Sequence, residues 1–282
     1  MPELPEVETV ARQLRTGSAE RGPSLIGRTV SRVTLRWARH VAVPSPGEFA
    51  HRLAGQTVLD ISRRGKYLVF RLDRDYLLIH LKMSGDLVVV GDKAPPDKHA
   101  HTVFHLKAGG QLRFSDTRKF GRVYLVSRPE EVVGGLGPEP LAPGFTARYL
   151  GERLARRHRA LKPLLLDQTF LAGLGNIYTD EALHAARLHP LRCSDSLRPD
   201  EVRALWRAIR RVLRSGLRHN GSSIDWVYRG GEHQHHFRVY DRAGKPCFTC
   251  GTPIRRTVVG QRGTYFCPRC QRLRLPPGNN KE

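Results

Sequence analysis

Four cysteines near the end of the chain constrain its fold more than any other feature. They form two Cys-x-x-Cys pairs, Cys247 with Cys250 and Cys267 with Cys270, separated by residues 251–266. Each pair can hold one side of a tetrahedral ion, and the spacing fits a zinc site with four thiolates. Two disulfides or a chance arrangement are the alternatives, and no secretion signal favours disulfides. A four-thiolate site leaves no coordination position open, so we expect one structural Zn2+.

The chain also carries a large positive excess. Its 282 residues include 48 Lys and Arg against 26 Asp and Glu, for a formal net charge of +22. The bases gather in residues 148–163, 198–218 and 238–274. Because nucleic acid is the most available polyanion in a cell, this charge predicts phosphate binding. No run reaches the roughly 18 apolar residues of a membrane span. The acidic N-terminus is no signal peptide, so we expect a soluble, cytoplasmic protein with no membrane partner.

Short apolar runs between residues 28 and 128 predict strands. Eight such runs, rich in Val, Leu, Phe and Tyr, are separated by Gly, Asp and Pro, which is typical of a β-sandwich or barrel. A helix over residues 5–16 should precede them. Beyond residue 144 the pattern becomes helical. The sequence therefore predicts an α+β fold with an N-terminal β-sandwich, flanking helices, a C-terminal helical domain and a zinc finger.

A Gly- and Pro-rich segment, 134–144, marks the boundary between domains. We predict a β-sandwich domain over 1–133, with 134–144 as the linker. A helical domain should cover 145–237, and the zinc finger 238–272.

Within the helical domain, apolar residues at helical spacing identify one long helix over 199–217, with arginines on its other face. Gly216 is the predicted end of this helix. A second helix should begin near Asn176, after a Gly-rich turn. Residues 218–237 follow neither period and predict a long functional loop. Cys193, which lies outside the two cysteine pairs, is expected to be a small buried residue.

Seven short motifs are spread over nearly the whole chain: PELPEVET (2–9), RRGKYL (63–68), HLKMSG (80–85), SDTRKFG (115–121), LGPEPL (136–141), GLGNIYTDEAL (173–183) and QRGTYFCPRC (261–270). Together they resemble the formamidopyrimidine-DNA glycosylases, bacterial enzymes that excise 8-oxoguanine. The resemblance implies a bifunctional glycosylase and AP lyase of base excision repair, which acts on damaged duplex DNA. It also implies a helix–two-turns–helix element in the helical domain. We expect the protein to be a monomer.

The resemblance assigns catalytic roles to five residues. Pro2, once it is the terminal residue, would be the nucleophile that forms a Schiff base with the deoxyribose. Glu3 would be the acid that opens the sugar ring, and Glu6 a supporting carboxylate. Lys66 matches the proton donor for β-elimination. Arg262 matches the donor for δ-elimination and a contact to the lesion phosphates; since an arginine rarely gives up a proton, its electrostatic role is the stronger expectation.

A further set of residues matches the DNA contacts of the family. Met83, Arg118 and Phe120 match the residues that fill the hole left by a base taken out of the stack. Loop 218–237 resembles the segment that closes over that base. The remaining expected contacts are His99, His158, Lys162, Asn176 and Tyr240.

Two positions depart from the family pattern, and two other functions stay open. Lys82 stands where glycine is usual, and His158 stands where lysine is common. One alternative is an endonuclease VIII-like glycosylase for oxidised pyrimidines, although that branch more often reads PEGPEI than PELPEV. The other is a non-catalytic, zinc-dependent protein that binds damaged DNA.

Overall fold

The computed structural model describes residues 1–223, 228 and 230–273. It divides into two compact units. The first comprises Met1–Gly135 together with His219–Glu232, and the second comprises Leu136–Arg218 and the chain from His233 onward. Within the described residues, no helix combines the length and the apolar character needed to cross a membrane.

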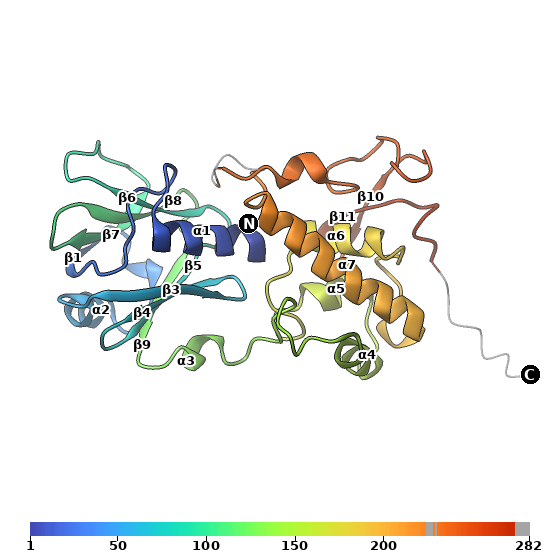
Figure 1. Cartoon of the computed structure of the whole chain (residues 1–282), viewed down its shortest axis with the longest axis horizontal. Coiled ribbons are helices and arrows are strands. Elements are labelled where there is room, and N and C mark those ends of the chain that lie inside the picture. The colour runs from blue at the N-terminus through green and yellow to red at the C-terminus, as the bar shows by residue number, and fades with distance from the viewer. Residues whose placement is uncertain (224–227, 229, 274–282) are drawn as a thin grey trace, which may run out of the picture. The chain divides into compact units, whose positions relative to one another are not determined.

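Two sheets form the first unit (Figure 1). One has four strands in the order β1-β7-β8-β6, and the other has five in the order β2-β9-β5-β4-β3. All neighbouring strands are antiparallel except β2 and β9. The strands are β1 (Val30–Leu35), β2 (Val41–Val43), β3 (Val58–Arg64), β4 (Tyr67–Leu72), β5 (Tyr76–His80), β6 (Gly85–Val90), β7 (Ala100–Leu106), β8 (Gln111–Asp116) and β9 (Arg122–Val126).

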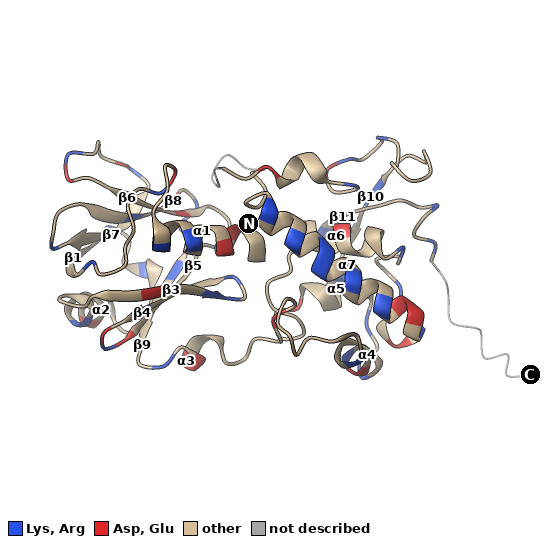
Figure 2. Cartoon of the chain, viewed as in Figure 1, with Lys and Arg blue, Asp and Glu red and all other residues tan. Residues whose placement is uncertain are grey.

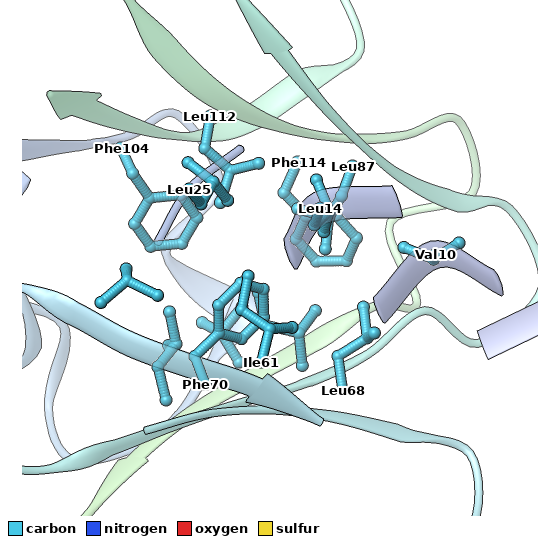
Figure 3. Packing of buried hydrophobic residues seen from close by; sticks show 14 of the residues in the cluster. Val10, Leu14, Leu25, Ile61, Leu68, Phe70, Leu87, Phe104, Leu112 and Phe114 are labelled. Atoms are coloured by element: carbon cyan, nitrogen blue, oxygen red, sulfur yellow. The ribbon is translucent and has the colours of Figure 1, made fainter. Parts of the chain in front are cut away.

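Side chains from both sheets fill the core of this unit. In β6 and β8 every second residue is buried, so that Leu87 pairs with Phe114 on the inner face. Figure 3 shows these residues with Phe104 of β7, facing Ile61 and Phe70 of the other sheet. The two facing sheets confirm the predicted β-sandwich.

Helix α1 (Leu4–Thr16) closes this core. Its residues Val7, Val10 and Leu14 recur at helical spacing and are fully buried. The helix packs against β3 and β4. The unit also contains η1 (Ala38–His40), α2 (Pro46–Leu53) and α3 (Glu130–Val133).

The second unit is helical (Figure 1). Its longest helix, α7, carries Val202, Leu205, Ile209 and Leu213 on its buried face. It packs against α4 and α6. The helical elements are α4 (Ala147–Ala155), α5 (Leu161–Leu166), α6 (Asn176–Ala185), η2 (Ser194–Ser196), α7 (Pro199–Arg218) and η3 (His233–His236), followed by the strand pair β10 (Arg255–Val259) and β11 (Arg262–Phe266).

Three details differ from the sequence expectations. Gly216 does not end α7, which runs to Arg218; a Cβ at this position would lie 2.5 Å from the Tyr178 hydroxyl oxygen, so glycine permits close packing with α6. Cys193 is partly exposed instead of buried. Residues 219–232, expected within the helical domain, contact the first unit. The predicted loop 218–237 lies partly outside the described residues, at 224–227 and 229.

Candidate active site and DNA interface

The carboxylate of Glu6 fixes the first residues of α1. Its Oε2 accepts a hydrogen bond from the backbone N–H of Glu3 at 2.8 Å, and its Oε1 accepts one from the N–H of Ser222 at 2.8 Å. The Glu3 side chain in turn accepts from the Glu6 backbone, which completes a reciprocal capping box. Glu3 and Glu6 are each 2% exposed, and Pro2 is buried. The start of the chain is therefore held by a hydrogen-bonded helix cap within the first unit.

The segment that begins at His219 packs tightly on this cap. Gly221 has φ +80°, and a Cβ there would lie 2.7 Å from Oε1 of Glu6. Arg12 donates to the side-chain oxygen of Asn220 at 2.6 Å, and the Tyr228 hydroxyl donates to the Asn220 carbonyl. Glycine at position 221 is therefore what lets this segment reach the Glu6 carboxylate.

Lys66 lies in the turn between β3 and β4, and Arg63 ties this turn to α1. The Arg63 guanidinium donates from Nε to Glu8 and from Nη1 to the Gly65 carbonyl, both at 2.9 Å. Lys66 is 5% exposed. Burial, together with the charges of Lys82 and Lys66, lowers the pKa of His80 to about 3, so His80 is neutral near pH 7. Lys66 is thus a buried cation in the same unit as Pro2 and Glu3.

Two neighbouring turns, 81–85 and 117–121, carry Met83, Arg118 and Phe120. The buried carboxylate of Asp116 joins these turns, because it accepts from the Ser84 hydroxyl, from the Gly121 N–H at 2.6 Å and from the Arg118 N–H at 3.2 Å. Burial alone would raise the pKa of Asp116, but the nearby His40 imidazole, 3.7 Å away, and hydrogen bonds from Ser84 and the turn backbone lower it to about 2.

The tips of both turns present their side chains to solvent. Met83 is 37% exposed and Phe120 is 49% exposed. The Arg118 guanidinium lies 5.1 Å from the centre of the Phe120 ring, in cation–π contact. Gly85 and Gly121 both pack against the Phe114 ring. A Cβ atom added to Gly85 would lie 2.7 Å from a ring carbon, and one added to Gly121 would lie 2.4 Å from a ring carbon. The structure therefore carries Met83, Arg118 and Phe120 on two turns that are joined through Asp116 and packed on the Phe114 ring.

His99 lies just before β7 and is half-buried. Its carbonyl accepts from the Asp116 N–H at 2.9 Å, and its own N–H donates to Asp97 at 2.8 Å. The backbone of His99 is therefore part of the framework that holds the 117–121 turn.

In the second unit, the carbonyl of Gly263 is the anchor of the turn that carries Arg262. It accepts from Nδ2 of Asn176, at the start of α6, and from Nζ of Lys162, both at 2.9 Å. Lys162 also forms an ion pair with Asp180 at 2.7 Å, with both side chains 0% exposed. Lys162 is expected to contact DNA, but in this structure its ammonium is buried between the Gly263 carbonyl and the Asp180 carboxylate. Arg262 itself is exposed.

Two consecutive carboxylates of α6 hold the backbone of the C-terminal segment. Asp180 accepts from the Tyr265 N–H at 2.9 Å. Glu181 accepts from the backbone N–H groups of Arg238, Val239 and Tyr240, at 2.8–2.9 Å. Burial raises the pKa of Glu181, against the lowering effect of these three donors. Both carboxylates therefore position residues next to expected DNA contacts.

Tyr240, His158 and α7 present polar groups from the second unit. Tyr240 is half-buried, with its ring 5.1 Å from that of Tyr265. The side chain of His158 is 84% exposed, in the loop after α4. Figure 2 shows basic residues along the whole length of α7 and acidic residues at its start. Acidic side chains at this end stabilise the helix through their interaction with its dipole.

The Sγ atoms of the four finger cysteines all lie within 4.8 Å of one another. The Sγ atoms are 3.5 Å apart for Cys250 and Cys267, 3.5 Å for Cys250 and Cys270, and 4.0 Å for Cys247 and Cys270. Thiolates on a tetrahedral zinc ion, with Zn–S of about 2.3 Å, are about 3.8 Å apart. The residues therefore fit one structural zinc ion, which would join the start of the finger to the end of the β10–β11 hairpin.

Three family models match the chain in order. They describe the formamidopyrimidine-DNA glycosylase N-terminal domain over residues 1–123, the formamidopyrimidine-DNA glycosylase H2TH domain over 136–227, and the zinc finger found in FPG and IleRS over 244–273. The chain belongs to the formamidopyrimidine-DNA glycosylase family. The predicted family, α+β fold and zinc finger are thereby confirmed.

Relatives and solved structures agree over nearly the full length. The formamidopyrimidine-DNA glycosylase of Symbiobacterium thermophilum is 50% identical over 280 residues, which cover 96% of this chain and 89% of the relative. Wild-type Lactococcus lactis Fpg (MutM), solved with N7-benzyl-Fapy-dG DNA, is 36% identical with a TM-score of 0.89. MutM with carbocyclic 8-oxo-G DNA is 35% identical with a TM-score of 0.87. Both matches cover 96% of this chain and 100% of the other.

Reasoning from the sequence missed four positioning residues of this family member: Ser84, Asp116, Asp180 and Glu181. All four lie inside motifs that the sequence had singled out. Asp180 and Glu181 could have been recognised from the sequence, because they are adjacent acids in a mostly apolar helix and buried carboxylates need hydrogen-bond or ion-pair partners.

Proposed function

We propose that this chain excises oxidised purines, 8-oxoguanine and formamidopyrimidines, from duplex DNA and then cleaves the strand by β,δ-elimination. It is a DNA glycosylase of its family, for which AP lyase activity is general. The observation that carries the proposal is the capped N-terminus, where Pro2 precedes a fixed Glu3–Glu6 pair. It acts as a monomer on DNA in the bacterial cytoplasm.

Pro2 is the nucleophile once Met1, which is 42% exposed, has been removed. An α-amine with pKa near 7.8 is roughly a tenth unprotonated at pH 7, against about one part in 2,500 for a lysine near 10.4. The amine attacks the deoxyribose C1′, the bond from C1′ to the base breaks, and the base leaves with the electron pair. Glu3 protonates the ring oxygen, so the sugar opens and an iminium ion forms at C1′.

The iminium charge acidifies the protons on C2′, which permits strand cleavage. Loss of a C2′ proton expels the 3′ phosphate by β-elimination, and a second elimination expels the 5′ phosphate. In the first elimination Lys66 donates a proton to the departing 3′ phosphate oxygen, while the C2′ proton passes to water. Arg262 stabilises the departing phosphate electrostatically in the second, because a guanidinium keeps its proton at neutral pH.

Recognition requires the damaged base to leave the stack, which costs a few kcal/mol. Met83 and Phe120 replace the lost stacking, and Arg118 pairs with the orphaned base. The Asp116 carboxylate supports this role, because its hydrogen bonds hold both turns in place before DNA binds.

The phosphate backbone is bound by exposed and partly exposed polar groups. Asn176 acts from the start of α6, where backbone N–H groups also favour an anion. Tyr240, His158 and His99 add further contacts. The finger's zinc ion, held by its four cysteines, has a structural role and no place in the reaction steps.

Borohydride trapping tests the mechanism. Reduction should link the chain covalently to a duplex that contains 8-oxoguanine and not to undamaged duplex, and Pro2→Gly should largely abolish trapping and cleavage. Pro46→Gly, at the start of α2, is the matched control and should leave both intact. Absence of a trapped complex with wild-type enzyme would refute the Schiff-base mechanism.

Two further measurements separate the alternatives. Cleavage of 8-oxoguanine duplex should exceed cleavage of thymine-glycol duplex, and the reverse order would favour an endonuclease VIII-like activity. N-terminal mass should show loss of Met1, since a retained methionine blocks the amine and favours a non-catalytic binder.

A further inference from the structure

Three potential metal ligands meet on the surface of the second unit, outside the zinc finger. They are His158, Cys193 and Asp195, whose ligand atoms all lie within 4.8 Å of one another. Nδ1 of His158 is 2.7 Å from Oδ2 of Asp195 and 3.4 Å from Sγ of Cys193. The side chains of His158 and Asp195 are 84% and 36% exposed, and Cys193 is partly exposed. An ion can therefore reach all three from solvent.

The backbone that presents these ligands is fixed. Ser194, between Cys193 and Asp195, is 1% exposed. Its hydroxyl donates to the Arg157 carbonyl at 2.5 Å, and its N–H donates to the Arg159 carbonyl at 2.9 Å. These bonds bracket His158 on both sides. The two ligand-bearing segments are thus joined before any ion binds, which lowers the entropy cost of binding.

The distances suit a zinc-class ion. With Zn–S of about 2.3 Å and Zn–N of about 2.0 Å, a thiolate and an imidazole on tetrahedral zinc lie about 3.5 Å apart. The observed 3.4 Å between Cys193 and His158 is close to this value. The carboxylate must move away by about half an ångström, from a hydrogen-bonded 2.7 Å to a spacing of about 3.3 Å. An exposed aspartate can make this small shift.

The geometry does not fit a nucleophilic triad. Such a triad uses one imidazole nitrogen for the carboxylate and the other for the thiol. Here Nδ1 faces both partners, since Nε2 of His158 lies farther from the thiol, at 3.9 Å. Three donors that converge on one point are the arrangement of a metal site.

We propose that His158, Cys193 and Asp195 form a second metal site, for a borderline or soft divalent cation such as Zn2+, Co2+ or Cd2+. Nitrogen, thiolate and carboxylate ligands select these ions over Mg2+ or Ca2+. Three protein ligands leave one coordination position for water, in contrast to the closed four-cysteine finger. The ion would be held more weakly than the finger's, because one thiolate takes the place of four and exposed arginines adjoin the site.

Cobalt titration of the full zinc-loaded chain tests this site. The starting protein should contain one zinc per chain after dialysis against a weak chelator. Added Co2+ should then bind in one further equivalent and produce a thiolate-to-cobalt charge-transfer band. Absence of the band would overturn the proposal.

Substitutions test which residues bind the cobalt ion that produces the charge-transfer band. Cys193→Ser should eliminate it, and its persistence would assign it to the finger and refute the site. His158→Ala and Asp195→Asn should each weaken cobalt binding by about tenfold or more, because even outer-shell partners of metal ligands matter by 10- to 100-fold. His51→Ala, at an exposed position of α2, is the matched control and should bind cobalt as wild type does.

A chemical version of the test needs no substitution. Alkylation of the zinc-loaded wild-type protein should modify Cys193, because the other four cysteines are held by the finger. The alkylated protein should keep its thermal unfolding temperature and lose the charge-transfer band. An unchanged band after complete modification of Cys193 would refute the site.

Discussion

Replacement of Lys162 by methionine tests whether this lysine organises the protein or contacts DNA. In the structure its ammonium pairs with Asp180 at 2.7 Å and donates to the Gly263 carbonyl at 2.9 Å, with no exposed surface. Methionine keeps the length and removes the charge, which leaves the Asp180 carboxylate buried without its cation. Loss of one partner of a buried ion pair costs about 3–5 kcal/mol of unfolding free energy.

Thermal unfolding and cleavage of lesion duplex together measure the effect of Lys162→Met. For a chain of this size, that loss lowers the unfolding temperature by roughly 10 °C. Cleavage of lesion duplex should also fall, because the turn that carries Arg262 loses one of the two donors to Gly263. The double variant Lys162→Met with Asp180→Asn removes the unpaired charge and should recover part of the stability.

An unchanged unfolding temperature together with a weaker salt dependence of DNA binding would refute the structural role of Lys162. If Lys162 contacts a phosphate, Lys162→Met should keep its unfolding temperature. The slope of log binding constant against log salt would then become shallower by about one. That combination would return Lys162 to the DNA surface.

Three further predictions follow from other buried groups. The Asp116 carboxylate, whose pKa falls from 3.8 to about 2 on folding, contributes about 2 kcal/mol of stability above pH 4 that is lost as the pH falls through 2. Urea unfolding against pH should show this loss for wild type and not for Asp116→Asn, and equal profiles would contradict it. Removal of zinc should unfold the β10–β11 finger, so that thiol titration finds five reactive cysteines instead of one; one reactive thiol after complete metal removal would contradict the four-cysteine site. Gly216→Ala should destabilise the protein by about 1–3 kcal/mol in thermal unfolding, because the new methyl group meets the Tyr178 ring, whereas Gly47→Ala has open space and should not. Equal unfolding temperatures for the two variants would show that the α6–α7 contact is loose.

Local patterns in the sequence predicted most of the fold. Short apolar runs bounded by Gly, Asp and Pro located all the long strands of the sandwich, both those that alternate, such as β6, and those buried along nearly their whole length, such as β7. The same logic missed β2, whose three residues are too short to show a period. It also missed α2, although Ser45 accepts from the Glu48 backbone there, in the manner of an N-cap.

Sequence motifs propose the residues of the candidate site, but the contacts of those residues cannot be predicted from the sequence. Motifs identified Pro2, Glu3 and Lys66, but the partners of Glu6 include a backbone group 216 positions away. The spacing of residues in a single sequence does not show which residues so far apart along the chain lie in contact. The buried state of Lys162 was unpredictable for a related reason, because the sequence does not show that its carboxylate partner, Asp180, lies beside it in α6.

The Glu6 carboxylate also bears on how this chain can be engineered. Residues 219–223 follow α7 and belong to no helix or named strand. In this fold they supply an N–H donor to the first turn of α1, so a graft or deletion there alters the end of the chain where the proposed nucleophile, Pro2, lies. An affinity tag fused before Pro2 would occupy the same crowded position. The beginning of the chain and residues 219–223 must therefore be redesigned together, and additions belong at the other terminus.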